Sequence, residues 1–279
     1  MLGVIAGDII GSVHERSKTK VKDFPLFVAD SHFTDDTVLS VAVADALLNN
    51  RLQDGSYVQT LKEYGKDYMH VGYGKSFKRW LASDSLEPYN SWGNGSAMRV
   101  SPVGFAYESI SDVMVSAQKT AEVTHNHTEG VKGAQATAAC VFLAKRGDSK
   151  VDIKSHIEQT FGYDLGRSLA DIRPGYKFYV SCQRSVPESI IAFLESTDFE
   201  DAVRNAVSLG GDADTMAAIA GGIAEAFYGG VPDAIAQEAL SRLDAPLRTT
   251  TLKFCDRYTP PPTTIPLALK QSARTTVTP

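Results

Sequence analysis

Cysteine is scarce in this sequence, and the few cysteines form no motif. Only three occur among the 279 residues, far apart in the chain, at Cys140, Cys182 and Cys255. An odd number of widely spaced thiols favours neither a disulfide framework nor a Cys-x-x-Cys metal site. We therefore expect three buried free thiols and a reducing, cytoplasmic compartment.

Positive charge and long apolar runs are also lacking. The net charge is −5, so the chain has no basic field that would bind nucleic acid non-specifically or attract an anionic membrane. No apolar run approaches the roughly 20 residues that a membrane-spanning helix needs. The opening MLGVIAGDII has no basic residue ahead of its apolar stretch, so we expect no signal peptide. These absences predict a protein that works away from membranes, and we expect a monomer.

Alternating strand patterns are few, and the best of them is the short run KFYVS at 177–181. Apolar residues instead recur at spacings of three and four, which is typical of helices, and frequent alanine allows helices to approach closely. The pattern predicts helices at 3–14, 35–49, 53–70, 112–123, 129–145, 186–196, 199–209 and 213–228. Because strands do not alternate with helices, Rossmann and barrel folds are excluded and the fold class is all-α.

The chain has no stretch that is typical of an interdomain linker. We expect a single domain over residues 1–258. The last segment, 259–279, contains TPPPTTIP, and proline excludes helix there, so an extended or partly disordered tail is predicted.

Two acidic clusters each precede a helical pattern. Thr34, Asp35 and Asp36 stand before VLSVAVADALL, where a helix cap is the simplest explanation, because Thr is a good N-cap and acids favour a first turn. Two glycines precede the second cluster, Asp212-Ala213-Asp214-Thr215, which indicates a tight bend or a close approach. One domain must bring these two clusters together if they act jointly.

Taken together, the clusters predict a metal centre. Four carboxylates gathered without a cation would repel each other, and some would have to stay protonated. All the candidate ligands are oxygens, which favours Mg²⁺, Mn²⁺ or Ca²⁺ over zinc or copper. Six side chains shared between two ions would leave positions open for water and substrate.

Several further motifs occur between the clusters. They are GDIIG at 7–11 followed by Glu15, TDDT at 34–37, GYG at 72–74, SWGNGSAMRVSPVG at 91–104, THNHTEG at 124–130 and GGDADT at 210–215. In content and order this series resembles the ADP-ribosylglycohydrolase family, which includes the dinitrogenase reductase-activating glycohydrolases. The resemblance covers roughly residues 3–230.

The resemblance implies a compact orthogonal helical bundle with two Mg²⁺ or Mn²⁺ ions and a substrate that carries ADP-ribose. By matching position, the implied metal ligands are Thr34, Asp35, Asp36, Asp212, Asp214 and Thr215. The loops that line the diphosphate and ribose would contain Gly72, Gly74, Ser91, Trp92, Gly93 and Asn94. His125 falls where the family has a histidine at the far end of the pocket, and Glu15 matches a glutamate on a mobile loop beside the reacting ribose.

The chemistry suggests roles for three carboxylates. Cleavage of a glycosidic bond develops positive charge on the sugar, and carboxylates ordinarily assist it. We therefore name Glu15, Asp35 and Asp214 as catalytic candidates, and the sequence leaves open whether Asp35 or Asp214 transfers the proton. Without the resemblance, a surface salt bridge would be the simpler reading of Glu15. Asp8, inside an apolar helix, is expected to hydrogen-bond the ligand residues without binding metal itself.

Other polar and aromatic residues have two interpretations each. Trp92 and Tyr73 fit stacking on a base or ribose as well as core packing. Arg99 is interpreted either as a phosphate contact or as a member of an internal ion pair. His125 and His127 lack a third nitrogen or sulfur partner for zinc, so turn and cap chemistry or contact with the adenosine half is favoured. Residues 16–32 are expected at the pocket rim, with Lys18, Lys20 and Lys22 as a solvated basic face.

The sequence thus favours a hydrolase that releases ADP-ribose from a modified protein side chain, nucleic acid or small molecule. Two alternatives stay open: a binuclear-metal phosphoesterase, and a non-catalytic ADP-ribose binder on the same fold. Arginine, serine, O-acetyl-ADP-ribose and nucleotide linkages are all compatible with the sequence.

Overall fold

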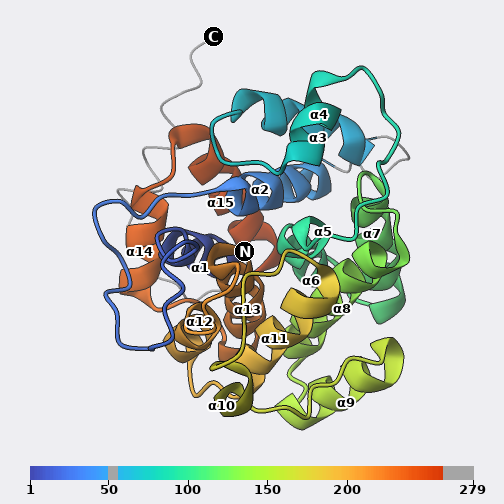
Figure 1. Ribbon diagram of the computed structural model, residues 1–279. Coiled ribbons are helices and arrows are strands. Elements are labelled where there is room, and N and C mark those ends of the chain that lie inside the picture. The colour runs from blue at the N-terminus through green and yellow to red at the C-terminus, as the bar shows by residue number, and fades with distance from the viewer. Residues whose placement is uncertain (50–55, 260–279) are drawn as a thin grey trace.

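The protein folds into an all-α bundle, as predicted (Figure 1). A computed structural model describes residues 1–49 and 56–259. Its helices are α1 (Leu2–Gly11), α2 (Asp35–Leu48), α3 (Ser56–Asp67), α4 (Lys75–Ala82), α5 (Gly95–Met98), α6 (Ser101–Ala106), α7 (Ile110–Glu122), α8 (Thr128–Arg146), α9 (Lys150–Phe161), α10 (Leu169–Ile172), α11 (Cys182–Leu194), α12 (Phe199–Val207), α13 (Ala213–Tyr228), α14 (Asp233–Ser241) and α15 (Ala245–Tyr258). Within the described ranges, the one β-type pairing outside helices is an isolated antiparallel bridge between Gly93 and Ser181.

Helix α13 lies in the middle of the bundle, and α1, α8, α11 and α12 pack against it (Figure 1). Its residues from Ala213 to Glu225 are buried, as are all ten residues of α1. A helix that is apolar on every side is expected where neighbours surround it. The pairing of α1 with α13 joins the two ends of the sequence, so it brings the helix that carries GDIIG beside the start of the helix that follows GGDADT.

Glycines allow α1 and α13 to approach closely. A β-carbon on Gly7 would lie 2.1 Å from the Ala217 carbonyl oxygen, and one on Gly3 would lie 2.2 Å from the Gly221 carbonyl oxygen. Both obstacles are backbone atoms, which cannot rotate away. The two helices therefore depend on glycine at these positions to keep their spacing.

Substitution of Gly7 tests this packing. We expect Gly7→Ala to destabilise the fold by about 3 kcal/mol or more, since overpacking against rigid backbone lies at the upper end of the range for such changes. Urea denaturation followed by circular dichroism measures the effect. Gly175→Ala is the matched control, because a β-carbon there meets no atom within 4 Å. A Gly7→Ala protein as stable as the control would contradict the close-approach argument.

The predicted helix limits differ from the observed ones at several places. The helix expected over 3–14 ends at Gly11, where the Ser12 hydroxyl donates to the Ile9 carbonyl at 2.9 Å and turns follow. The strand expected at 177–181 is wrong, because this segment is irregular and only Ser181 forms the bridge to Gly93. The short helices α4, α5, α6 and α10, together with α9, α14 and α15, were not predicted.

Some predictions lie outside the described residues. They are the start of the helix expected at 53–70 and the tail after Thr259. The single-domain boundary at 258 stays a prediction. Among the described helices, none combines the length and the apolar character that a membrane span requires. The three cysteines are buried and free, as expected.

Candidate metal centre

The starts of α2 and α13 position the two acidic clusters. Thr34 is the N-cap of α2, and its hydroxyl accepts from the Asp36 amide at 3.3 Å, so the cap interpretation of the first cluster is confirmed. Asp212 occupies the N-cap of α13 but makes no capping bond with its side chain. Its carboxylate instead accepts from the Asn94 side-chain amide at 2.7 Å. The second cluster is therefore not explained by helix capping.

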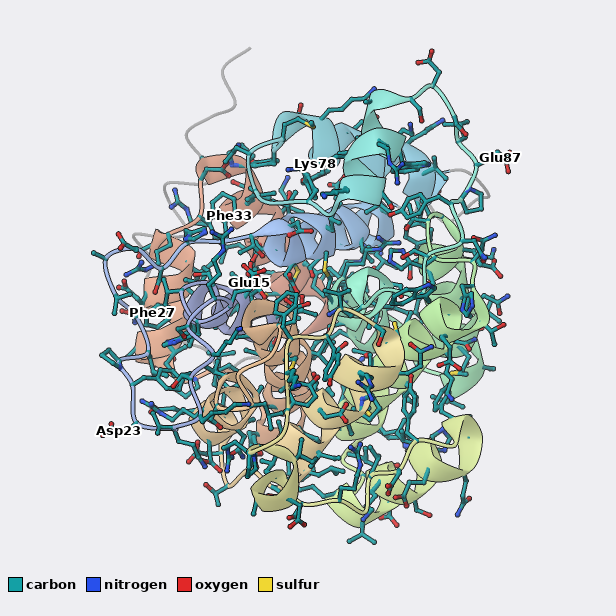
Figure 2. All side chains as sticks on the ribbon, in the orientation of Figure 1. Glu15, Asp23, Phe27, Phe33, Lys78 and Glu87 are labelled. Carbon is teal, nitrogen blue, oxygen red and sulfur yellow. The ribbon has the colours of Figure 1, made fainter. Side chains whose placement is uncertain are left out.

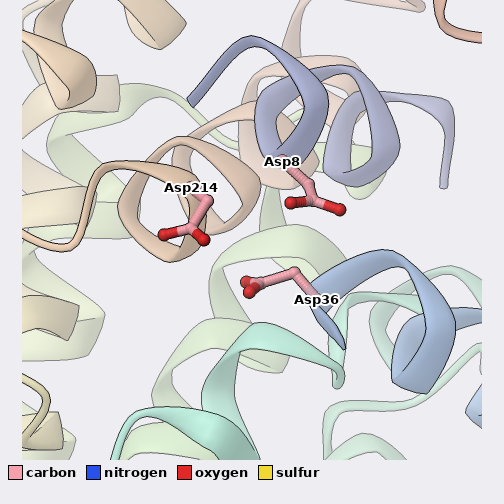
Figure 3. Close-up of side chains that lie close together, drawn as sticks. All are labelled: Asp8, Asp36 and Asp214. Carbon is pink, nitrogen blue, oxygen red and sulfur yellow. The ribbon is translucent and has the colours of Figure 1, made fainter. Parts of the chain in front are cut away.

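The carboxylates of three helices converge (Figure 3). One carboxylate oxygen from each of Asp8, Asp36 and Asp214 lies within 4.8 Å of the others. Glu15, Asp212 and Asp214 form a second such group with the same limit. Because Asp214 belongs to both groups, it lies between two adjacent clusters of oxygen ligands. This arrangement is compatible with two neighbouring cations.

Asp8 on α1 is bound to the start of α2 by four hydrogen bonds. Its carboxylate accepts from the Thr34 amide at 2.9 Å and hydroxyl at 2.7 Å, and from the Thr37 amide at 3.1 Å and hydroxyl. The expectation that Asp8 hydrogen-bonds the TDDT segment is confirmed. Thr37 was not singled out from the sequence, because its hydroxyl becomes relevant only once α1 lies beside α2.

Burial and mutual repulsion raise the pKa values of this group. Burial followed by the charge of Asp214 holds the pKa of Asp36 and of Asp212 well above the usual aspartate range. Burial also raises the pKa of Asp35 to about 8 and that of Asp214 to about 6. The pKa of Asp8 is raised by burial too, although its threonine hydrogen bonds oppose the shift. Carboxylates so crowded in the interior favour either protons or cations.

The polar atoms around Asp36 fit a hard divalent cation. Its Oδ2 accepts from the Thr215 hydroxyl at 3.2 Å, whereas its buried Oδ1 has no hydrogen-bond partner. A buried carboxylate oxygen without a donor is costly unless a cation binds it. Both groups consist of carboxylates alone, which is the donor set of Mg²⁺, Mn²⁺ or Ca²⁺. The residues present therefore fit the metals that the sequence predicted.

Glu15 lies in the turn that leaves α1, so its predicted loop position is confirmed (Figure 2). Burial and the nearby charge of Asp214 raise the pKa of Glu15. No ion pair involving Glu15 occurs within residues 1–49 and 56–259, so the surface salt bridge is wrong. Its carboxylate faces the acidic centre.

The loop that carries Glu15 is anchored at several points. Lys20 Nζ donates to the Tyr176 carbonyl at 2.7 Å and to the Leu209 carbonyl. Lys22 forms an ion pair with Asp201. The expected solvated face is therefore wrong for these two lysines, which bind other parts of the fold. The sequence gave no sign of this role, because the partners of Lys20 are backbone carbonyls.

The loop SWGNGS lies against the segment before α11. The Asn94 amide donates to the Val180 carbonyl at 2.7 Å, and the Cys182 amide donates to the Trp92 carbonyl at 3.1 Å. The side chain of Trp92 is 49% exposed and remains available to a ligand. Tyr73 is instead buried, with its ring 5.0 Å from that of Phe77, so core packing is the correct interpretation for it.

Arg99 and the two histidines have buried or capping roles. Arg99 is 1% exposed and donates to the Thr120 carbonyl and the Thr124 hydroxyl, so the expected internal ion pair is wrong. His127 caps α8 by accepting from the Glu129 amide at 3.1 Å, which confirms the cap interpretation. His125 is buried, and burial together with Arg99 holds its pKa well below the usual histidine range.

Comparison with known proteins agrees with this geometry. The sequence model of the family described as ADP-ribosylglycohydrolase matches residues 1–263. The chain belongs to the ADP-ribosylglycohydrolase family. Its relatives include ADP-ribosylhydrolase ARH3 of Gallus gallus, which is 29% identical over 82% of this chain and 84% of its own. ADP-ribosylarginine hydrolase Tri1 of Pseudomonas putida (strain GB-1) is 27% identical over 82% of this chain and 69% of its own.

The fold of this ADP-ribosylglycohydrolase also has a counterpart among solved structures. One described as an ADP-ribosylglycohydrolase-related protein complex superposes with a TM-score of 0.64, at 24% identity, over 91% of this chain and 95% of that one. The family therefore establishes the fold and the class of hydrolase, and the converging carboxylates provide an acidic site suited to metal.

Proposed function

We propose that this protein is a metal-dependent ADP-ribosyl hydrolase that cleaves the glycosidic bond between ADP-ribose and a modified target. One observation supports this most strongly: the buried carboxylates of two adjacent groups share Asp214 and have no basic side chain among them. Such a group is stable at neutral pH only when cations or protons neutralise it. A structural role alone would not require this concentration of charge.

In this proposal, the ions are held by the side chains of Thr34, Asp35, Asp36, Asp212, Asp214 and Thr215. When bound, two Mg²⁺ or Mn²⁺ ions would supply Lewis-acid chemistry that orients sugar hydroxyls and makes a water more acidic. Asp8 and Asn94 would act from outside, since their hydrogen bonds fix the Thr34 and Asp212 side chains.

The protein's own groups would perform the remaining steps. Asp35 is only half-buried and lies within electrostatic reach of Asp214 and Glu15, so it is suited to exchange a proton with the leaving group or with water. Asp214 is the alternative for this proton transfer. Glu15, on its anchored loop, would meet the ribose face of the substrate. The exposed Trp92 ring and the open backbone at Gly72 and Gly74 would receive other parts of ADP-ribose.

Product analysis tests this proposal. The protein is incubated with ADP-ribosylated arginine and serine peptides, O-acetyl-ADP-ribose and an ADP-ribosylated oligonucleotide, each with Mg²⁺ and with EDTA. We expect free ADP-ribose from at least one substrate, and only with the metal. AMP or inorganic phosphate as the product would instead identify a phosphoesterase. Binding of ADP-ribose without turnover of any substrate would identify a non-catalytic binder.

A further inference from the structure

A buried cation lies behind the SWGNGS loop. Arg99 follows α5 and has no carboxylate partner within the described part of the chain. Its Nη2 donates to the Thr120 carbonyl at 2.8 Å and to the Thr124 hydroxyl oxygen at 2.9 Å, while its Nε has no partner. A guanidinium group so far from water is normally paired with an acid.

The contact between Arg99 and Thr124 determines the direction of the next hydrogen bond. A guanidinium group can only donate, so the Thr124 oxygen is the acceptor. The single hydroxyl hydrogen of Thr124 is then directed to His125 Nδ1, 2.7 Å away. Burial and the nearby Arg99 charge also disfavour the imidazolium form. His125 is therefore neutral, with its hydrogen on Nε2.

The Nε2 atom of His125 faces the substrate loop. A β-carbon on Gly95 would lie 3.1 Å from Nε2, and one on Gly93 would lie 3.6 Å away. The imidazole thus lies directly against both glycines. No described residue forms a hydrogen bond with Nε2. Its N–H group is therefore available to an acceptor that enters along the loop.

We propose that Arg99 and Thr124 are positioning residues that hold His125 as a neutral Nε2–H donor, and that this donor binds an anionic oxygen of the ligand diphosphate. The identity of the ligand rests on the proposed function, whereas the direction of the hydrogen bonds does not. A diphosphate oxygen is favoured over a ring nitrogen of adenine, because an anion also compensates the charge of Arg99, which the protein leaves without a carboxylate. A ligand group that can only donate would be rejected at this position.

Thr124→Val tests the relay with little change of shape. We expect ¹⁵N-detected NMR of the wild-type protein to show His125 at pH 7 as the single Nε2–H tautomer. By calorimetry, Thr124→Val should bind ADP-ribose about tenfold or more weakly, which is the range for a lost hydrogen bond to a charged group. Thr124→Ser, which keeps the hydroxyl, should restore both the tautomer and the affinity. Thr137→Val is the matched control, because Thr137 is equally buried and its hydroxyl has no partner.

Each result has a defined meaning. An Nδ1–H tautomer or an imidazolium in the wild-type protein would overturn the relay. So would ADP-ribose affinity in Thr124→Val equal to that of Thr137→Val. Adenosine serves as the second ligand: we expect its binding to be unchanged by Thr124→Val, and an equal loss for adenosine would reassign the acceptor to adenine and overturn the diphosphate contact. If wild-type protein binds no ADP-ribose while the tautomer is as expected, the proposed function fails and the relay stands.

Discussion

Replacement of Asp36 by asparagine is expected to abolish hydrolysis and to make the metal-free protein more stable at pH 8. The carboxylate of Asp36 is buried among Asp8, Asp35, Asp212 and Asp214, all of which raise its pKa together with burial. Removal of one charge relieves that repulsion, and the asparagine oxygen can still accept from Thr215. Activity should fall at least about 10²-fold, because even residues that only support metal ligands account for about 10–100-fold.

Asp148→Asn is the matched control for this substitution. Asp148 pairs with Arg146, and this hydrogen-bonded contact lowers its pKa. Its replacement should leave hydrolysis unchanged and reduce stability slightly, the opposite direction to Asp36→Asn. Steady-state release of ADP-ribose and urea denaturation in EDTA measure the two effects. An Asp36→Asn protein that retains activity, or that is destabilised in EDTA, would contradict the role given to the acidic centre.

Magnesium is expected to stabilise the protein increasingly as the pH rises. In the metal-free protein, the pKa of Asp214 is raised to about 6 and that of Asp35 to about 8, from an ordinary value of 3.8. The folded state therefore keeps these protons at pH values where the unfolded chain has lost them. Stability in EDTA should fall as the pH rises from about 4 to about 8. Bound Mg²⁺ should remove this loss, because it replaces the protons.

Thermal denaturation at pH 5.5 and pH 8, with Mg²⁺ or EDTA, measures this linkage. Magnesium at 100 times its dissociation constant contributes about 2.7 kcal/mol, which corresponds to about 5–10 °C in a chain of this size. We expect the full shift at pH 8, a smaller one at pH 5.5, and little at either pH for Asp36→Asn. A shift of equal size at both pH values would show that metal binding does not compete with protonation of these carboxylates.

Charge was the most informative property of the sequence. Thr34-Asp35-Asp36 and Asp212-Ala213-Asp214-Thr215 could each cap a helix, yet two such clusters in one domain indicated a shared cation. The structure brings Asp36, Asp212 and Asp214 together, and family membership agrees with it. Asp8 was also recognisable, because an aspartate inside an apolar helix requires hydrogen-bond donors, and Thr34 and Thr37 provide them.

Contacts that depend on tertiary packing were not recognisable. Arg99 was expected to meet an acid or a phosphate, but within the protein its acceptors are a carbonyl and the Thr124 hydroxyl. Lys20 lies in a basic run that is typical of a solvated face, yet it binds two carbonyls. The run at 177–181 has strand-like residues, but it lacks a neighbouring strand to complete a sheet. In each case the partner is a backbone group, whose position cannot be inferred from side-chain identity.

The most direct test of the metal centre is an anomalous diffraction map from crystals of the full chain grown with Mn²⁺. We predict two peaks, bounded by Asp36 and Asp214 and by Asp212 and Asp214, with Thr34, Asp35 and Thr215 among the ligands. The same crystals of Asp36→Asn should lose at least one peak. A map with no manganese at these carboxylates, or with manganese bound elsewhere, would contradict the account.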